Sequence, residues 1–390
     1  MFSSRTDWLL APNRLTRQLE ERRRQGLPVL DLTESNPTRC GFAPEHEILQ
    51  SLQDPQALVY EPDPRGPLRA RHAVCEYYAA HGVSVAPEQI FLTTSTSEAY
   101  TYVFRLLADP GDKVLVPQPS YPLFDFLAGI NDLEVVSYPL HYQDEWRMDL
   151  DAVRDGWVTG AKAAIVVHPN NPTGSFVKSP ELDLLAECCR QNQGALIADE
   201  VFADYVLEAG EGRVLSHAAD SQVLTFTLSG LSKISALPQM KLGWVVVSGP
   251  EGELKTALER LEVIADTYLS VSAPIAHALP ALLEFRKTVQ PRIIERLKSN
   301  LFWLEQQTAR CREVARLKTE GGWYAVLKVP ESVSDEDWAV ELLTVEGVLV
   351  HPGHFYDFPD DGHLVISLLT DEPAFQEGIG RILARVSKSS

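Results

Sequence analysis

Short apolar runs alternate with longer amphipathic segments through the middle of the chain. Four of these runs are expected to form strands: residues 91–94, 163–167, 195–197 and 223–228, of which the last is β-branched and aromatic. Between the first of them and a further strand-like run at 113–121, apolar residues recur at helical spacing. Strands that alternate with helices predict a mainly parallel sheet with right-handed crossovers.

The pattern changes in the last third of the chain. Helices are expected at 252–264 and 273–289, and a long helix from Pro291 to about Arg316 then leads into a smaller unit. Within that unit we expect strands and helices in the order 324–329, 335–345, 348–351, 363–370 and 372–386. We therefore expect a large domain at 51–290 and a C-terminal small domain at 291–390.

A lysine lies between two of the expected strands. The stretch SGLSKISALPQMKLGW, residues 229–244, joins the run at 223–228 to the apolar run at 244–248 and contains Lys233. Desolvation disfavours an ammonium group, so a lysine here is poorly placed as a solvated surface charge. Taken alone, a Ser-Lys pair is more often an exposed loop tip. The stretch also carries a second cation, Lys241, eight residues on.

Two further motifs change that balance. HPNNPTG, residues 168–174, and ADEVFADY, residues 198–205, each follow an expected strand, as the lysine stretch does. With this combination the chain resembles the fold-type I pyridoxal-phosphate enzymes, specifically the class I/II aminotransferase superfamily, from about Asn36 to Ser367. The resemblance implies an α/β fold with a mainly parallel, seven-stranded-type sheet sandwiched by helices, and a smaller α+β domain built from both termini. It thereby assigns residues 1–50, as an N-terminal segment, to the small domain. It also implies pyridoxal 5'-phosphate as the cofactor.

The resemblance assigns roles to the central residues of these motifs. Lys233 matches the Schiff-base lysine and Asp199 the carboxylate that pairs with the pyridine nitrogen. Asn171 matches the residue that hydrogen-bonds the phenolic oxygen, and Lys241 the phosphate-binding cation. A buried lysine can exchange a proton with the substrate, and a carboxylate beside the ring nitrogen keeps that nitrogen protonated.

Further positions complete the expected cofactor site. Ser95, Thr96 and Ser97 stand where a strand feeds a helix, and the free N–H groups of a helix N-terminus suit a phosphate. On its own, a Ser/Thr-rich N-cap explains this run equally well. Tyr121, in PSYP, matches the family's aromatic residue that stacks on the pyridine ring. A loop tyrosine whose hydroxyl faces solvent is the alternative.

The chain departs from the family pattern within the cofactor site. Phe202 stands where many relatives have a tyrosine that hydrogen-bonds the phenolic oxygen, and phenylalanine cannot form that bond. Gly230 replaces a frequent phosphate-binding serine, for which Ser229 or Ser232 could substitute. Lys241 itself replaces the more usual arginine, so a compact ammonium group stands where a planar guanidinium group is expected.

The largest departure concerns the substrate carboxylate. The family's C-terminal arginine, which holds that carboxylate, falls on Val365 in this chain. Either another cation replaces it, or the substrate is an amine whose carboxylate is remote or absent. The candidate replacements are Arg39, Arg65, His351 and His354.

The N-terminal part carries expected contacts with substrate and with a second subunit. In the family a segment at this place lies over the active site, which makes Asn36 and Arg39 candidate substrate contacts. An ordinary Asn-Pro turn explains Asn36 at least as well. Tyr60 matches a tyrosine that reaches the phosphate of the neighbouring subunit's cofactor, so the resemblance implies a homodimer with shared active sites.

Composition narrows the class of protein. The net charge of −19 disfavours nucleic-acid and anionic-membrane binding, which require a basic face. Hydrophobic residues make up 45% of the 390 residues, and no apolar run reaches membrane-spanning length. Five cysteines without CxxC spacing are typical of reduced thiols, and we expect a cytoplasmic protein.

Together these observations predict an enzyme. We expect an aminotransferase that moves an amino group from an amino acid or amine to a 2-oxo acid through Lys233, with no metal. Two alternatives stay open. One is another pyridoxal-phosphate reaction, such as C–S lyase, β- or γ-elimination, synthase or racemase chemistry. The other is a non-catalytic sensor that binds the cofactor, which the acidic charge disfavours.

Overall fold

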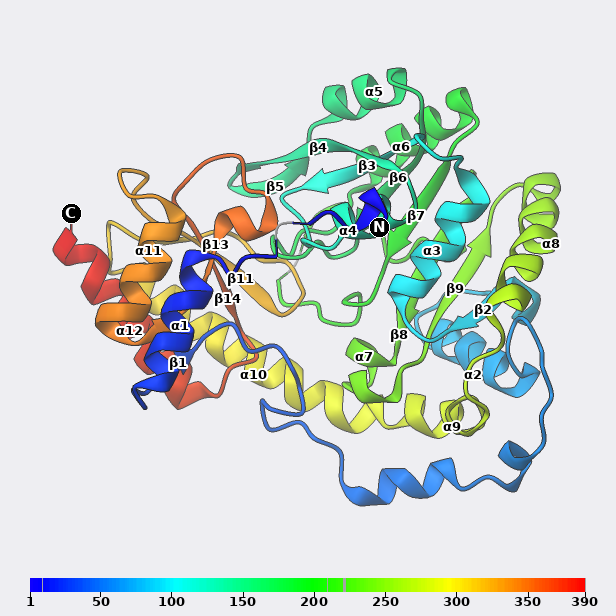
Figure 1. Ribbon diagram of the computed structural model, residues 1–390, viewed down its shortest axis with the longest axis horizontal. Coiled ribbons are helices and arrows are strands. Elements are labelled where there is room, and N and C mark those ends of the chain that lie inside the picture. Colours follow the sequence, from blue (N-terminus) through cyan, green and yellow to red (C-terminus); the bar gives the residue numbers. More distant parts are fainter. Residues whose placement is uncertain (9, 209, 220–221, 390) are drawn as a thin grey trace.

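The computed structural model describes residues 1–8, 10–208, 210–219 and 222–389, which form a large and a small domain (Figure 1). The large domain is built on eight strands in the order β2-β9-β8-β7-β6-β3-β4-β5. Their bounds are β2 (Ile90–Thr93), β3 (Lys113–Gln118), β4 (Glu134–Gln143), β5 (Glu145–Met148), β6 (Ala161–Val167), β7 (Ala195–Asp199), β8 (Thr225–Gly230) and β9 (Gly243–Ser248). From β8 to β4 the neighbours pair in parallel, whereas β9 is antiparallel to both β8 and β2.

The central strands are buried on both faces because nearly every residue in them is apolar. Alternate side chains point to opposite faces, so Ile165 and Ile197 pack on one side and Val166 and Leu196 on the other. The first face is covered by α3 (Thr96–Leu107), α4 (Phe124–Ile130) and α8 (Glu251–Tyr268). The second face is covered by α5 (Leu150–Val158) and α6 (Ser179–Asn192). The predicted arrangement of a mainly parallel sheet between helices is therefore confirmed.

Two more helices cover the β2–β9 edge of the large sheet. These are α2 (Leu68–Ala79) and α9 (Ala273–Glu284), which pack against each other and against Leu92 and Trp244. One four-residue helix, α7 (Leu231–Ile234), follows β8 directly. None of the described helices is both long enough and apolar enough to cross a membrane.

The small domain contains residues from both ends of the chain. Its sheet has the order β10-β11-β14-β13, formed by β10 (Ala315–Arg316), β11 (Tyr324–Lys328), β13 (His351–Pro352) and β14 (His363–Ser367). Around it lie α1 (Arg14–Arg24), α11 (Asp335–Glu341) and α12 (Glu372–Ser389), with a π-helical turn at Leu342–Glu346. The N-terminal β1 (Leu30–Asp31) pairs in parallel with β12 (Val348–Leu349). The predicted fold class, with a small domain from both termini, is confirmed.

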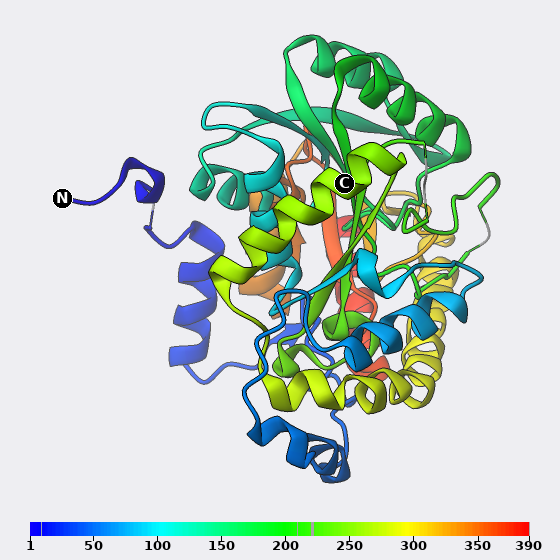
Figure 2. The same ribbon diagram turned by 90° about the vertical axis from the view of Figure 1, so that its right-hand side faces the viewer.

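Helix α10 (Arg286–Thr308) runs from the large domain into the small one (Figure 1). Figure 2 shows the first residues projecting from the body of the molecule, with α1 beside them. Arg5 nevertheless forms an ion pair with Asp132 of the large domain, so the N-terminal segment touches both domains.

The predicted bounds of two helices and the number of strands differ from the structure. The helix expected at 273–289 ends at Glu284. The long helix begins at Arg286 rather than Pro291 and ends at Thr308 rather than near Arg316, which lies in β10. Pro291 stands in the second turn of α10. The helix tolerates proline there because only the carbonyl of Lys287 loses its hydrogen-bond partner. The large sheet also has eight strands instead of seven, because the chain turns back at Asp144 and β5 pairs antiparallel with β4 at the edge.

Candidate active site

The three motifs of the sequence meet at one end of the large sheet. Asp199, the last residue of β7, pairs with Val167 of β6 and Leu228 of β8. The HPNNPTG loop therefore leaves β6 beside Asp199, and α7 with Lys233 leaves β8 on its other side. The register brings Asn171, Asp199 and Lys233 to adjacent strand ends, which is where open α/β sheets bind ligands.

Lys233 is held among aromatic rings on a short helix. Its Nζ lies 5.3 Å from the centroid of the Phe202 ring and 4.7 Å from that of the Trp323 ring. Burial lowers the pKa of its amine to about 8, and the Asp199 carboxylate opposes that change. The Tyr205 hydroxyl donates to the Lys233 carbonyl at 2.6 Å and thereby holds α7 in place. The amine is thus largely desolvated, with one carboxylate near it.

Asp199 forms hydrogen bonds but no ion pair with any described residue, and Lys233 is the cation that acts on it from nearby. Its carboxylate accepts from the Tyr100 hydroxyl at 3.2 Å and from the Val201 N–H at 3.1 Å. Burial raises the pKa of Asp199 to about 6, against the effect of those two bonds and of Lys233. A protonated ring nitrogen beside this carboxylate would supply the missing positive charge.

Asn170 and Asn171 have different environments although they are neighbours. The Asn170 amide donates to the Pro119 carbonyl at 3.0 Å and to the Thr173 hydroxyl at 2.9 Å, so it holds the loop together. Asn171 is also buried, but its Oδ1 has no partner among the described residues. A buried carbonyl oxygen without a donor is rare and costly, and a phenolic O–H of a bound ligand would satisfy it.

The expected phosphate end of the site lies at the N-terminus of α3. Ser95 is the N-cap residue, and its hydroxyl accepts from the Glu98 N–H at 3.2 Å. Thr96 and Ser97 supply the first helical N–H groups, which have no hydrogen-bond partner in the described part of the chain. A side chain on Gly243 would stand only 3.3 Å from the Thr96 nitrogen, so glycine there allows this close approach.

The other expected phosphate contacts lie near the same helix end. Gly230 pairs with Gly243, and a side chain on Gly230 would meet the Gly243 Cα at 2.8 Å. That contact explains why glycine replaces the expected serine. Ser229 is buried with its hydroxyl 3.5 Å from the Glu200 carbonyl, whereas Ser232 is partly exposed. Lys241 is exposed and has no ion-pair partner among the described residues.

Tyr121 and Phe202 occupy different positions around Lys233. Tyr121 is 42% exposed, and burial of the rest raises the pKa of its hydroxyl. Phe202 is buried with its ring edge-on to Trp323 at 5.4 Å. The hydroxyl that relatives have at this position is therefore replaced by an aromatic wall beside the Lys233 amine.

The N-terminal candidates make only local contacts within the single chain. The Asn36 side chain accepts from the Thr38 N–H at 3.1 Å and hydroxyl at 2.8 Å, which is the ordinary Asn-Pro turn. Arg39 is exposed, with Glu34 at 3.5 Å. Tyr60 is 76% exposed. Their roles toward substrate and partner stay predictions.

Sequence reasoning missed two residues that contact the central pair. Trp323 comes from the small domain and stacks over the Lys233 amine, and its Nε1 is buried without a partner among the described residues. Tyr100 reaches Asp199 from α3. Tyr100 lies one helical turn after Thr96, and this spacing could have indicated that both residues face the site. For Trp323, the local signal was the pair Gly321-Gly322 just before a strand.

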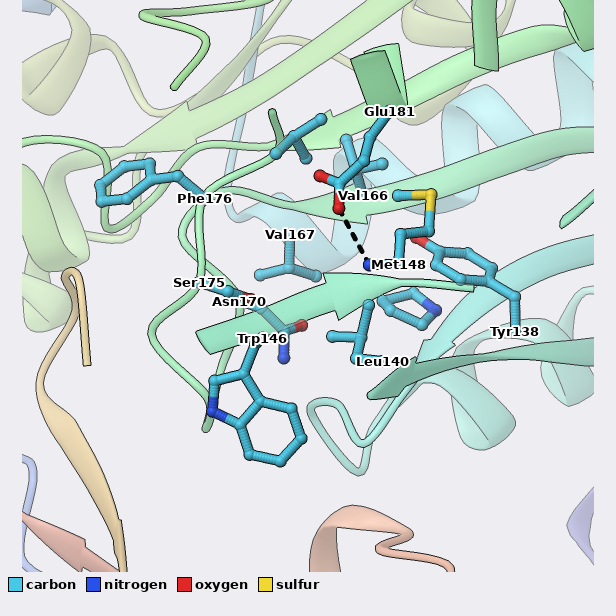
Figure 3. Close-up of a pocket in the computed structure, with 12 residues that line it drawn as sticks. Tyr138, Leu140, Trp146, Met148, Val166, Val167, Asn170, Ser175, Phe176 and Glu181 are labelled. Atoms are coloured by element: carbon cyan, nitrogen blue, oxygen red, sulfur yellow. Dashed lines mark hydrogen bonds between the residues drawn. The ribbon is translucent and has the colours of Figure 1, made fainter. Parts of the chain in front are cut away.

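The cavity behind the HPNNPTG loop is not the cofactor site. It has a volume of about 20 Å³ and lies among Trp146, Tyr138 and Asn170 (Figure 3). The dashed bond in Figure 3 joins the Met148 N–H to Glu181, which is buried there. Such a volume holds about one water molecule, so a pyridine ring does not fit. The described residues also contain no cluster of side chains suited to a metal ion.

Comparison with known proteins identifies the family. The model of the family Aminotransferase class I and II matches residues 29–382. The glutamate-pyruvate aminotransferase AlaA of Escherichia coli is 28% identical over 90% of this chain and 88% of its own length. An S-alkyl-thiohydroximate lyase of Arabidopsis thaliana is 29% identical over 83% of this chain and 73% of its own length.

Solved structures agree with this assignment. The alanine aminotransferase from Pyrococcus furiosus superposes with a TM-score of 0.88 at 23% identity and covers the whole of both chains. An aminotransferase from Escherichia coli gives a TM-score of 0.85 at 25% identity, over 99% of this chain and 98% of its own. The chain belongs to the class I and II aminotransferase family and is a pyridoxal-phosphate-dependent aminotransferase.

Proposed function

We propose that the chain moves an amino group from an amino acid or amine to a 2-oxo acid, with Lys233 and Asp199 as the catalytic residues. The observation that carries the proposal is the meeting of Lys233, Asp199 and Asn171 at adjacent strand ends. Among the described residues, none of the three has the partner that would explain it as purely structural: the Lys233 amine is desolvated, Asp199 forms no ion pair and the Asn171 amide oxygen is unpaired.

These residues fit pyridoxal phosphate. The Asn171 side-chain amide would hydrogen-bond the phenolic oxygen, and the α3 N-terminus at Thr96 and Ser97 would bind the phosphate, with Lys241 and Ser232 as further donors. Tyr121, with its ring half-exposed, would cover the pyridine face. Phe202 would contribute a contact but no hydrogen bond, which leaves Asn171 as the polar group proposed for the phenolic oxygen.

Each catalytic residue handles one proton. When bound, the cofactor supplies an electron sink for the electron pair left on the substrate's α-carbon. Lys233, whose amine is kept partly neutral by burial, would remove the proton from that carbon and deliver it to the C4′ atom of the cofactor. Asp199, as a carboxylate, holds a proton on the ring nitrogen. The aromatic rings of Phe202 and Trp323 exclude water from the Lys233 amine.

The lyase among the relatives makes elimination the rival reaction, and one experiment separates the two. Single amino acids and simple amines are added to the purified enzyme while the absorption of the bound cofactor is recorded. In amino transfer the spectrum changes with a donor and returns when a 2-oxo acid is added. Release of ammonia and pyruvate without any acceptor would instead establish elimination.

We further propose that the enzyme is a homodimer with shared active sites and works in the cytoplasm. An exposed apolar run supports the first point, since Leu58 is 89%, Val59 56% and Tyr60 76% exposed. A second subunit that covers this run would place Tyr60 beside the partner's phosphate site. Reduced thiols support the second point, because Cys40, Cys75, Cys188 and Cys311 form no disulfide.

A further inference from the structure

The strand position where the family's arginine is expected faces an apolar wall. Val365 of β14 is fully buried and packs with Val326, Trp146 and Tyr356. Val326 is its direct neighbour on β11, and Tyr324, two residues before Val326, lies on the same face of the sheet. This face of the small-domain sheet is turned toward the large domain, from which Trp146 comes.

A histidine stands directly beside Val365. In the antiparallel pair of β13 and β14, His351 is the residue opposite Val365, and opposite residues project to the same face. The His351 Nδ1 lies 3.0 Å from the Tyr356 hydroxyl. His351 is only partly buried, and its Nε2 has no hydrogen-bond partner among the described residues. Burial lowers the pKa of this imidazole, opposed by the Asp31 carboxylate, so the ring is neutral near pH 7.

A chain of aromatic contacts connects this pair to the reacting lysine. The Tyr356 and Tyr324 rings lie 6.5 Å apart, and the Tyr324 and Phe202 rings 6.4 Å apart. The Phe202 ring in turn lies 5.3 Å from the Lys233 Nζ. Tyr121 is close enough to influence both Tyr324 and Tyr356 electrostatically. A series of ring contacts therefore leads from the His351–Tyr356 pair to Phe202, which adjoins the Lys233 amine.

The other cations that could replace the arginine are engaged or exposed. Arg65 donates to the Glu262 carboxylate at 2.6 Å and also to the Glu88 carbonyl. Arg39 is 75% exposed at its side chain, with Glu34 beside it. His354 is exposed. Of these candidates, only His351 is paired in register with Val365.

We propose that the His351–Tyr356 pair binds the α-carboxylate of the amino acid and 2-oxo acid substrates through neutral hydrogen bonds, with Val365 as an uncharged wall beside it. The inference rests on the proposed amino transfer. In the neutral pair the Tyr356 hydroxyl donates to Nδ1, which leaves the Nε2–H free to donate to a carboxylate oxygen. Hydrogen bonds from neutral donors are weaker than those of a bidentate guanidinium, so the site selects less strongly for a carboxylate than an arginine would.

The test compares two probes that do not react. Binding of 3-phenylpropanoate and of propylbenzene, which has no hydrogen-bond acceptor, to the holoenzyme is measured by calorimetry for the natural chain, His351→Ala and Tyr356→Phe. Each substitution should weaken binding of the carboxylate by about tenfold or more and leave that of propylbenzene within about twofold. Equal effects on the two probes, or no effect on either, would overturn the proposal.

Two controls separate this outcome from other failures. His354→Ala, in the same segment but exposed, should change neither dissociation constant by more than about twofold. Tyr356→Phe keeps the buried ring, so it preserves packing if His351→Ala disturbs the fold. Amino transfer from any donor, followed through the cofactor's absorption, tests the proposed function separately: its complete absence in the natural chain would refute that function, whatever the probes do.

Discussion

At the scale of single residues, the chemistry depends on how Lys233 and Asp199 are surrounded. Burial lowers the pKa of the Lys233 amine to about 8 and raises the pKa of the Asp199 carboxylate to about 6. The two shifts have the same cause, because desolvation disfavours either charge. A site prepared in this way gains stability when a cationic ring nitrogen binds beside Asp199 and when Lys233 reacts as the neutral amine.

The depressed pKa of Lys233 predicts the pH dependence of cofactor attachment. Only the neutral amine reacts with an aldehyde, so the rate at which the apoenzyme takes up pyridoxal phosphate should rise by about tenfold per pH unit below pH 8 and then level off. Stopped-flow absorption measures this rate. In Asp199→Asn, which removes the carboxylate that raises the pKa of Lys233, the midpoint should move to lower pH. A rate in the natural chain that still climbs toward pH 10.5 would show that the amine is not desolvated.

The motif residues of the site could be predicted from sequence, whereas their aromatic neighbours could not. Asn171, Asp199 and Lys233 each follow a strand signal directly, so their common edge depends only on local pattern and parallel order. Trp323 reaches the site from a different domain. The Gly321-Gly322 pair before it indicates a turn, but not that the ring will meet Lys233.

At the scale of elements, residues 320–322 of the small domain are bonded to the loops that carry the proposed site. Gly321 donates its N–H to the Gly174 carbonyl and Gly322 donates to the Tyr205 carbonyl, each at 2.9 Å. Beside them, the Lys178 ammonium lies 2.5 Å from both carboxylate oxygens of Glu320, and both side chains are buried. This segment leads directly into Trp323, so the ion pair positions the ring that covers Lys233.

Breaking this buried pair should be strongly destabilising. Glu320→Gln leaves the Lys178 charge buried without compensation and is expected to lower the free energy of unfolding by about 3–5 kcal/mol in chemical denaturation. Glu284→Gln, which removes the partner of the exposed Lys287, is the matched control and should cost less than about 1 kcal/mol. A loss at Glu320 no larger than the control's would show that the pair contributes nothing to holding the segment.

The element boundaries show where local sequence signals fail. Pro291 is typical of a helix start, yet α10 begins five residues earlier because Arg286 and Val289 are buried against other elements. The short β5 is an edge strand of four residues, and its pairing depends on the turn at Asp144 rather than on a long apolar run. Packing between distant segments, which a single sequence does not display, decides both.

At the scale of the whole molecule, the exposed run at Tyr60 predicts that the active site is completed by a second subunit. Tyr60→Phe should weaken cofactor binding, and Lys233→Ala should be inactive. When Tyr60→Phe and Lys233→Ala are refolded together, a mixed dimer has one active site with both substitutions and one with neither. Activity should then recover to about a quarter of the natural value. If each Tyr60 served its own subunit, mixing would give no recovery.

The most direct test of the central claim is to identify the lysine that holds the cofactor. The purified holoenzyme is reduced with borohydride, digested, and its labelled peptide is sequenced by mass spectrometry. The account predicts that the label lies on Lys233 and disappears in Lys233→Ala, with the fold retained by circular dichroism. A label on Lys241 or Lys178, or one that persists in Lys233→Ala, would contradict it.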